Sequence, residues 1–389
     1  MSDRIESVEV HAFSYDVRDV GMDGGGQNIT YRPGNVHTLG SYAVVITCAD
    51  GSRGEYVAMW GGSPMSLAQT RALAPLLVGR DPTERERIFD DCKRAHRQYD
   101  HMGYGTLDIA LWDLTGKRAQ RPIAELLGVY RRDLPAYASS FHGDREGGLS
   151  SPEDYADFAE QCLELGYPAF KIHGWCEGNP KEESAAILRV AERVGDRMEL
   201  MVDPACELRT FADMLQVGRA CDEAEVRWYE DPMRDSGVSQ HAYRRLREAI
   251  KTPILQTEHV RGIEPKSDFV VAGGTDLLRA DPEYDLGITG AMKIAHIGEG
   301  FGMDVELHAS GPAHRHCMAA MRNTSFYEVA LVHPKVPNPV PPVYACGYSD
   351  QLEAVNADGT FPVPTGPGLG VTYDWDFIRA HRTAVDIYS

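Results

Sequence analysis

From residue 134 onward, the chain repeats one pattern that leaves few possible folds: a short apolar run followed by a helical stretch. The apolar runs are typical of buried parallel strands, and stretches such as residues 151–166 and 179–195 have the period of amphipathic helices. The runs are LPAYAS, AFKIHG, MELMVD, VRWYED, PILQTE, TDLLRAD, DVELHA and SFYEVAL. Eight such repeats predict an α/β barrel of the TIM type. An open doubly wound sheet is the alternative, but the sequence has neither a GxGxxG motif nor a P-loop.

The beginning of the chain has a different pattern. Residues 4–13 alternate between polar and apolar like a strand, and residues 41–58 are predicted to form a hairpin that turns at residues 49–51. Residues 21–38 are polar and rich in Gly, so we predict a mobile functional loop there, with a disordered surface excursion as the alternative. Helical periodicity over residues 66–128 completes a predicted α+β unit.

Every predicted barrel strand from the second onward carries ionisable residues at or near its C-terminal end. These ends meet at the rim of a barrel, where active sites lie. Between Asp203 and His308, successive residues of this set are 23 to 28 positions apart, the length of one strand–helix repeat. One such acid alone is most simply a helix cap, but seven consecutive strands predict a shared site. The residues are Lys171, His173, Asp203, Glu230, Glu258, Asp281, His308 and Glu328.

Three acids on neighbouring strands, Asp203, Glu230 and Glu258, would repel each other without a cation. Hard oxygen ligands with vacant positions suit Mg²⁺, which keeps waters and accepts substrate oxygens. Zn²⁺ is disfavoured because no Cys or His joins the three acids. We therefore predict a Mg²⁺ site formed by these three residues.

The remaining rim residues suggest acid–base chemistry on an anion. Asp281 and His308 come from adjacent strands, and a carboxylate beside an imidazole fixes its tautomer and raises its basicity, as a general base requires. Lys171 and His173 are separated by one residue, so they share a strand face, and Lys171 supplies positive charge. Glu328 is predicted to hydrogen-bond a substrate carboxylate if it is protonated; a structural role is the alternative.

The overall charge argues against several function classes. The chain has 58 acidic and 39 basic residues, a net charge of −19, and no block of Lys and Arg, so nucleic acids and anionic membranes are poor partners. The N-terminus has no signal-peptide pattern, and no apolar run approaches the length of a membrane span. The eight cysteines form no CxxC pair, which suits reduced thiols. We expect a cytoplasmic enzyme that acts on a small-molecule carboxylate.

Taken together, these segments resemble the enolase superfamily, and within it the mandelate racemase subgroup. VDP, YEDP and TEH resemble the three metal-ligand strands of that family, and RADPEYDLGITG and ELHASGP resemble its Asp and His strands. DIALWDLTGKRAQRPIAELLG resembles the helix that joins the family's cap to its barrel, and GPGLGVTYDWD its C-terminal return. The resemblance covers nearly the whole chain. It implies an α+β capping domain over residues 1–130, a (β/α)7β TIM-like barrel over 131–345, and a C-terminal segment, 346–389, that returns to the cap.

The resemblance also implies a mechanism and a homo-oligomer. The substrate carboxylate binds Mg²⁺, a base removes the α-proton, and the metal holds the enediolate; such schemes are general for this superfamily. His308 matches the base and Asp281 the residue that orients it. Residues that match the other family positions are the ligands Asp203, Glu230 and Glu258, the first lysine of a Lys-x-Lys motif, Lys171, and the acid on the last strand, Glu328.

The sequence departs from the family pattern at three places. His173 stands where the second lysine is expected, Pro204 and Ala205 stand where an Asn often follows the first ligand, and Thr257 replaces a Gly before Glu258. These changes leave the predicted metal site and the His–Asp pair intact, but they alter the second base.

Loss of that lysine favours dehydration of a sugar acid, an aldonate or aldarate, to a 2-keto-3-deoxy acid. His308 could act in both steps of a syn elimination, or His173 could be the acid. The first alternative is a racemase, epimerase or cycloisomerase with His173 and His308 on opposite faces of the substrate. The second is a barrel that only binds sugar acids, although a binder has no use for an Asp-oriented His.

The polar stretch and two tryptophans are predicted to contact the substrate. Arg32 could meet the distal carboxylate of an aldarate; the alternative is that Arg32 and His37 face solvent. The other residues in this group are Gln27, Asn28 and Asn35 as hydrogen-bond donors, and Trp60 and Trp175 at the border of the pocket.

Overall fold

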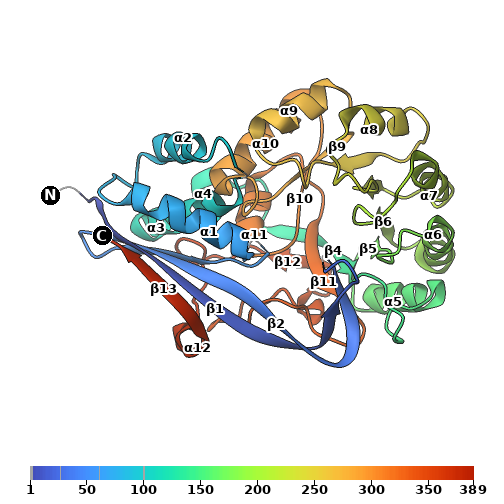
Figure 1. Cartoon of the computed structure of the whole chain (residues 1–389), viewed down its shortest axis with the longest axis horizontal. Coiled ribbons are helices and arrows are strands. Elements are labelled where there is room, and N and C mark those ends of the chain that lie inside the picture. Colours follow the sequence, from blue (N-terminus) through green and yellow to red (C-terminus); the bar gives the residue numbers. More distant parts are fainter. Residues whose placement is uncertain (1–2, 27, 61, 100) are drawn as a thin grey trace.

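The computed structural model describes residues 3–26, 28–60, 62–99 and 101–389, which form two sheets of different kinds (Figure 1). One is a long antiparallel sheet built from the start and the end of the chain. The other is a curled parallel sheet whose strands lie inside a ring of helices. Within the described residues, no helix is both long and apolar enough to cross a membrane.

The curled sheet confirms all eight predicted strands. Its strand order is β10-β9-β8-β7-β6-β5-β4-β11, with every neighbouring pair parallel. The strands are β4 (Asp133–Ser140), β5 (Ala169–His173), β6 (Glu199–Asp203), β7 (Trp228–Glu230), β8 (Ile254–Gln256), β9 (Leu277–Ala280), β10 (Val305–Leu307) and β11 (Tyr327–Val332).

One helix lies between each pair of consecutive strands, which confirms the predicted (β/α)7β architecture. The helices are α5 (Pro152–Glu164), α6 (Pro180–Val194), α7 (Phe211–Glu223), α8 (Gln240–Arg247), α9 (Ile263–Val271), α10 (Gly287–Phe301) and α11 (Pro312–Ala320). Several begin with the expected caps; the side chain of Thr210, for example, accepts from the Asp213 amide in a capping box that starts α7.

β10 and β11 are the two ends of this hydrogen-bonded path, and mainly side chains join them. The Val305 amide donates to the Asn323 carbonyl over 2.8 Å. Glu306 accepts from the amide and hydroxyl of Ser325, and Glu328 accepts from the Ala309 amide over 2.6 Å. Carboxylates therefore bridge this seam, where the other strand pairs have a backbone ladder.

Strand periodicity explains why the rim is polar. Tyr137, Ala169, Met201, Trp228 and Leu255 form a buried cluster inside the barrel. Since side chains alternate between the two faces of a strand, the residue two positions further on faces the interior as well. Lys171, Asp203 and Glu230 each follow a member of this cluster by two positions. The same alternation that fills the barrel thus directs the strand-end residues toward one space.

The antiparallel sheet has the order β13-β1-β2-β3. Its strands are β1 (Ile5–Met22), β2 (Ile29–Cys48), β3 (Arg53–Val57) and β13 (Arg382–Tyr388), and the predicted turn between β2 and β3 is confirmed. α1 (Pro64–Leu73), α2 (Arg85–Ala95), α3 (Gly105–Ala119) and α4 (Ile123–Leu127) follow β3. The chain ends through β12 (Thr360–Pro362), which pairs with β4, α12 (Trp375–Ala380) and then β13, which lies along β1.

The predicted mobile loop over residues 21–38 is wrong. β1 and β2 continue through most of it as a two-stranded ribbon, in which Val20 pairs with Tyr31 and Gly21 with Thr30. The backbone ladder satisfies this polar, Gly-rich segment, and few apolar side chains, such as Ile29 and Tyr31, pack against the core, so its composition gave no clear strand signal. Thr30 also forms a bridge with His142 after β4, and the far end of the ribbon therefore lies at the barrel rim (Figure 1). Gln27 lies outside the described residues.

The contact between β3 and α3 generates a test of the fold. A methyl group at Gly54 would overlap the Ala110 carbonyl oxygen and lie 2.6 Å from Leu114 Cβ. We expect Gly54→Ala to lower the free energy of unfolding by about 3 kcal/mol, the upper range for an overpacked core. Gly40→Ala in β2 is the control, because no atom lies within 4 Å of its added methyl. Urea denaturation measures both, and equal stability of the two variants would contradict the close packing.

Candidate active site

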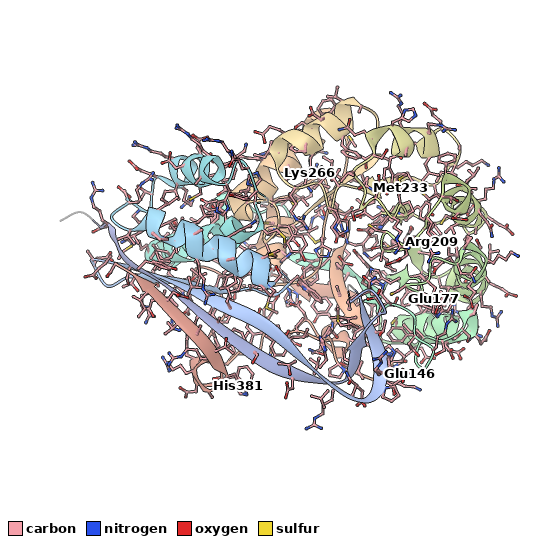
Figure 2. All side chains as sticks on the ribbon, in the orientation of Figure 1. Glu146, Glu177, Arg209, Met233, Lys266 and His381 are labelled. Atoms are coloured by element: carbon pink, nitrogen blue, oxygen red, sulfur yellow. The ribbon has the colours of Figure 1, made fainter. Side chains whose placement is uncertain are left out.

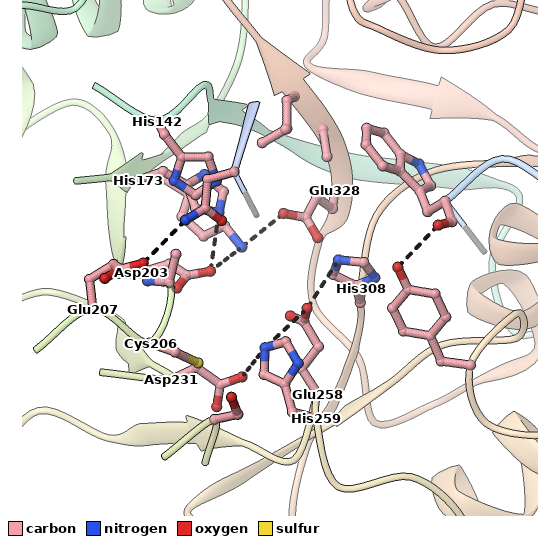
Figure 3. Close-up of a pocket in the computed structure, with 18 of the residues that line it drawn as sticks. His142, His173, Asp203, Cys206, Glu207, Asp231, Glu258, His259, His308 and Glu328 are labelled. Atoms are coloured by element: carbon pink, nitrogen blue, oxygen red, sulfur yellow. Dashed lines mark hydrogen bonds and ion pairs between the residues drawn. The ribbon is translucent and has the colours of Figure 1, made fainter. Parts of the chain in front are cut away.

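A cavity of about 440 Å³ opens at the C-terminal ends of the barrel strands. Six of the predicted chemical residues line it, together with the predicted substrate contact Trp60: they are Lys171, His173, Asp203, Glu258, His308 and Glu328. Figure 3 shows most of these side chains pointing into one space from different strands. The structure therefore brings most of the predicted rim residues together.

His308 and Asp281 form a pair at one side of the cavity. Asp281 Oδ2 lies 2.7 Å from His308 Nδ1, and the Glu283 amide donates to Asp281 Oδ1 over 2.6 Å. A carboxylate only accepts, so Nδ1 carries the proton and Nε2 is left facing the cavity, 3.4 Å from Glu258 Oε1. Burial opposes protonation of His308, but Glu258 and Asp281 outweigh it and raise the pKa to about 9. Tyr284 stacks on the ring at 5.1 Å. This arrangement is that of a basic, oriented imidazole.

Lys171 is a buried cation surrounded by carboxylates. Its Nζ lies 2.8 Å from Glu328 Oε1, 2.9 Å from Glu230 Oε2 and 3.4 Å from Asp203 Oδ2. Burial alone would lower the pKa of this ammonium, but Glu230 and Glu328 raise it well above its ordinary value. Lys171 therefore stays charged at the cavity wall.

His173 lies across the cavity from His308 (Figure 3). Its Nδ1 is 2.7 Å from the Ser140 carbonyl and its Nε2 is 3.1 Å from Asp203 Oδ2. Both neighbours are acceptors, so the ring satisfies both only as a double donor. His142 lies against it with ring centroids 4.8 Å apart, and burial and His173 lower the pKa of His142 to about 3. His173 is thus held between two acceptors, with the ring of His142 against it.

Two of the three predicted metal ligands line the cavity, and the third does not. Asp203 and Glu258 face it, whereas Glu230 is fully buried between Lys171 and Arg279, whose Nε lies 2.7 Å from Glu230 Oε1. Burial raises the pKa of Glu230 above its ordinary value, whereas His308 and His259 outweigh burial and lower the pKa of Glu258; the nearby charge of Asp203 acts upward on both. The donor set of the three carboxylates fits Mg²⁺, since it offers oxygen ligands from adjacent strands beside a cavity that admits water and substrate.

Glu328 does not fit the predicted role as a protonated donor. Burial alone would raise its pKa, but Arg279 and Lys171 hold it well below the ordinary range. Arg279 Nη2 lies 2.6 Å from Glu328 Oε2, on the side opposite Lys171. An ionised Glu328 accepts hydrogen bonds and cannot donate one to a substrate carboxylate.

Four predicted substrate contacts, Arg32, Asn35, His37 and Trp175, lie outside the cavity. Trp175 is buried and packs edge-on against Tyr155 with ring centroids 5.1 Å apart. Arg32 is half-exposed and faces Glu146 at 3.6 Å, beside the far end of the β1–β2 ribbon (Figure 2). His37 pairs with Val17 within the ribbon. The positions of Arg32 and His37 differ from the prediction because the segment is a strand pair, which points its side chains in fixed directions.

Asn28, a predicted hydrogen-bond donor, reaches the cavity from the turn of the ribbon, where its Nδ2 donates to Glu207 Oε1 over 3.3 Å. Several other cavity residues were missed from the sequence: His142, Cys206, Glu207, Asp231, Arg234, His259 and Tyr284. Asp231 and His259 directly follow predicted ligands, so adjacency to a strand end was the available signal. His142 follows the first strand, whereas the predicted set of rim residues begins at the second strand.

The chain is similar in sequence to known protein families and to individual characterised proteins. Residues 154–377 match an enolase C-terminal domain-like family model, and residues 30–128 match the mandelate racemase / muconate lactonizing enzyme N-terminal domain. A D-galactarolactone cycloisomerase from Agrobacterium fabrum is 28% identical over 357 residues, 87% of this chain and 90% of that protein. An arabinonate dehydratase from Saccharolobus solfataricus is 25% identical over 350 residues, 86% and 89% of the two chains.

The fold of the chain is also similar to that of a solved structure. The crystal structure of D-glucarate dehydratase from Agrobacterium tumefaciens complexed with magnesium has a TM-score of 0.85 and 28% identity to this chain. The match covers 99% of this chain and 100% of that one.

The buried charges around Arg279 generate a test of the site's architecture. We expect Arg279→Met to lower the free energy of unfolding by about 3–5 kcal/mol, because it leaves Glu230 and Glu328 with uncompensated buried charge. Arg379→Met is the control, since Arg379 forms a largely exposed pair with Asp376 at 3.3 Å. Denaturation curves should show a loss for the first variant only. A stable Arg279→Met protein would show that Lys171 alone neutralises the cluster.

Proposed function

The chain belongs to the mandelate racemase / muconate lactonizing enzyme family of the enolase superfamily, and on this premise we propose that it dehydrates a sugar acid. The substrate would be an aldonate or aldarate and the product a 2-keto-3-deoxy acid. Relatives named arabinonate dehydratase and D-glucarate dehydratase support the substrate class. The observation that carries the proposal is the His308–Asp281 pair, which opens on the same cavity as Lys171, Asp203 and Glu258.

In this proposal Asp203, Glu230 and Glu258 hold Mg²⁺. The bound ion would attract the substrate carboxylate and stabilise the negative charge that develops on it when the α-proton leaves. The charged Lys171 ammonium acts on the same carboxylate from the cavity wall. Both contributions favour the transition state over the bound carboxylate, because the additional negative charge develops only as the α-proton leaves.

His308 Nε2 accepts the α-proton in the neutral form of the ring, in which Asp281 holds the one proton at Nδ1. A cation bound to Glu258 would oppose the charge that raises the pKa of His308, and would so favour that neutral form. The electrons of the broken C–H bond form a double bond between Cα and Cβ, and the Cβ–O bond breaks. The leaving hydroxyl takes a proton from His173 and departs as water. The double-donor geometry of His173 supports this acid role. The enol product then tautomerises to the 2-keto acid.

Screening acid sugars tests the proposal. Purified protein with Mg²⁺ should form a 2-keto-3-deoxy acid from at least one aldonate or aldarate, detected with a keto-acid reagent and mass spectrometry. EDTA should stop the reaction and added Mg²⁺ should restore it, because the carboxylates lose the cation that binds the substrate. No keto acid from a broad panel would refute dehydration.

A racemase or epimerase is the second candidate, favoured by one observation: His173 and His308 lie on opposite sides of the cavity (Figure 3). One imidazole would remove the α-proton, and the other would return a proton to the opposite face. In D₂O, this reaction incorporates deuterium at Cα without loss of water. Such exchange in the absence of keto acid would replace dehydration by epimerisation.

His308→Asn tests the base for either reaction. We expect turnover to fall by at least about 10³-fold, because the side chain keeps a similar size but cannot accept the proton. Circular dichroism and Mg²⁺ binding should stay unchanged. His296→Asn on the exposed face of α10 is the matched control and should keep full activity. Comparable turnover in the two variants would remove His308 from the mechanism.

A further inference from the structure

Three side chains of different chemistry meet at one edge of the cavity. Cys206, Asp231 and His259 follow β6, β7 and β8, and one possible ligand atom of each lies within 4.8 Å of the other two. Figure 3 shows Asp231 between the other two side chains. The Cys206 amide donates to the Asp231 carbonyl over 2.8 Å, so the first two connections are tied together.

Asp231 is the unusual member of this cluster. Asp231 is only 2% exposed, and neither of its carboxylate oxygens has a hydrogen-bond partner among the described residues. His259 Nε2 lies 3.6 Å from Asp231 Oδ2, beyond hydrogen-bond distance. Other charged neighbours of Asp231 include the carboxylates of Glu230 and Glu258. A buried carboxylate in such surroundings is costly unless a cation or a proton compensates it.

The geometry points to a second cation site: we propose that Cys206, Asp231 and His259 bind a divalent ion of borderline softness, such as Zn²⁺, beside the proposed Mg²⁺ site. A thiolate, an imidazole and a carboxylate are the ligands that Zn²⁺ selects, whereas Mg²⁺ avoids sulfur. The thiol releases its proton on binding, and the thiolate and carboxylate together balance the charge of the ion.

The spacing suits this coordination. Zn–S bonds of about 2.3 Å and Zn–N or Zn–O bonds of about 2.0–2.2 Å place tetrahedral ligand atoms roughly 3.5 Å apart. Atoms already within 4.8 Å of one another reach that spacing by side-chain movements of about 1 Å. Three protein ligands leave the fourth position open to the cavity, for water or a substrate oxygen. Cys206 and His259 thus accompany an acid at this edge of the cavity, whereas no Cys or His joins the three proposed Mg²⁺ ligands.

Cobalt absorbance tests the site, because Co²⁺ replaces Zn²⁺ and a thiolate ligand gives it a charge-transfer band in the near ultraviolet. Co²⁺ is titrated into the full chain with Mg²⁺ in excess, which occupies the oxygen-only site. We expect the band to appear and Zn²⁺ to remove it. Cys206→Ser should abolish the band, and Asp231→Asn and His259→Gln should each weaken Co²⁺ binding at least tenfold. Circular dichroism checks that every variant is folded.

Cys176→Ser is the matched control, because Cys176 is also partly buried but is not part of the cluster, and the band should persist in this variant. Co²⁺ binding without the band, a band that survives Cys206→Ser, or one that disappears in Cys176→Ser would overturn the proposal. The dehydratase proposal is judged by keto acid formed with Mg²⁺ alone. Each proposal can therefore fail while the other stands.

Discussion

Two buried cations, Lys171 and Arg279, compensate the carboxylates inside the barrel. Both contact Glu230 and Glu328, and Lys171 also reaches Asp203. These five side chains come from five different strands, so the network joins most of the barrel at one level. In a low-dielectric interior, a buried charge is strongly destabilising unless an opposite charge compensates it. The positions of the cavity carboxylates therefore depend on a charge balance that Glu230 and Arg279 complete behind the cavity wall.

The barrel and much of its rim could be predicted because both follow from one local rule. Alternation along a strand fills the interior at Ala169, Met201 and Trp228, and two positions later it delivers Lys171, Asp203 and Glu230 to the same side. The rule holds wherever the backbone stays extended. It needs no knowledge of which strands are neighbours, since all strands of a parallel barrel end at one rim.

The rule fails where the backbone leaves the extended conformation. Cys206 and Asp231 have φ values of 61° and 33°, and Thr257, just before Glu258, has 93°. Non-glycine residues in this region turn the chain sharply, so sequence spacing no longer shows where their side chains point. The loop prediction over the β1–β2 ribbon was wrong for another reason. A backbone ladder formed there in a polar segment that carries no clear apolar alternation. The domain boundaries at residues 130 and 345 stay a prediction.

The strands β10 and β11 are joined differently from the other neighbouring strands of the barrel. A continuous ladder resists separation through many parallel bonds, whereas this joint relies on a few side-chain contacts of Glu306 and Glu328. His308 follows the strand on one side of the joint, and Glu328, with its attached Lys171, belongs to the other. The imidazole and the ammonium therefore stand on opposite sides of the seam. A ligand that contacts both groups connects the two sides of the seam. Part of its binding free energy then stabilises the barrel as a whole.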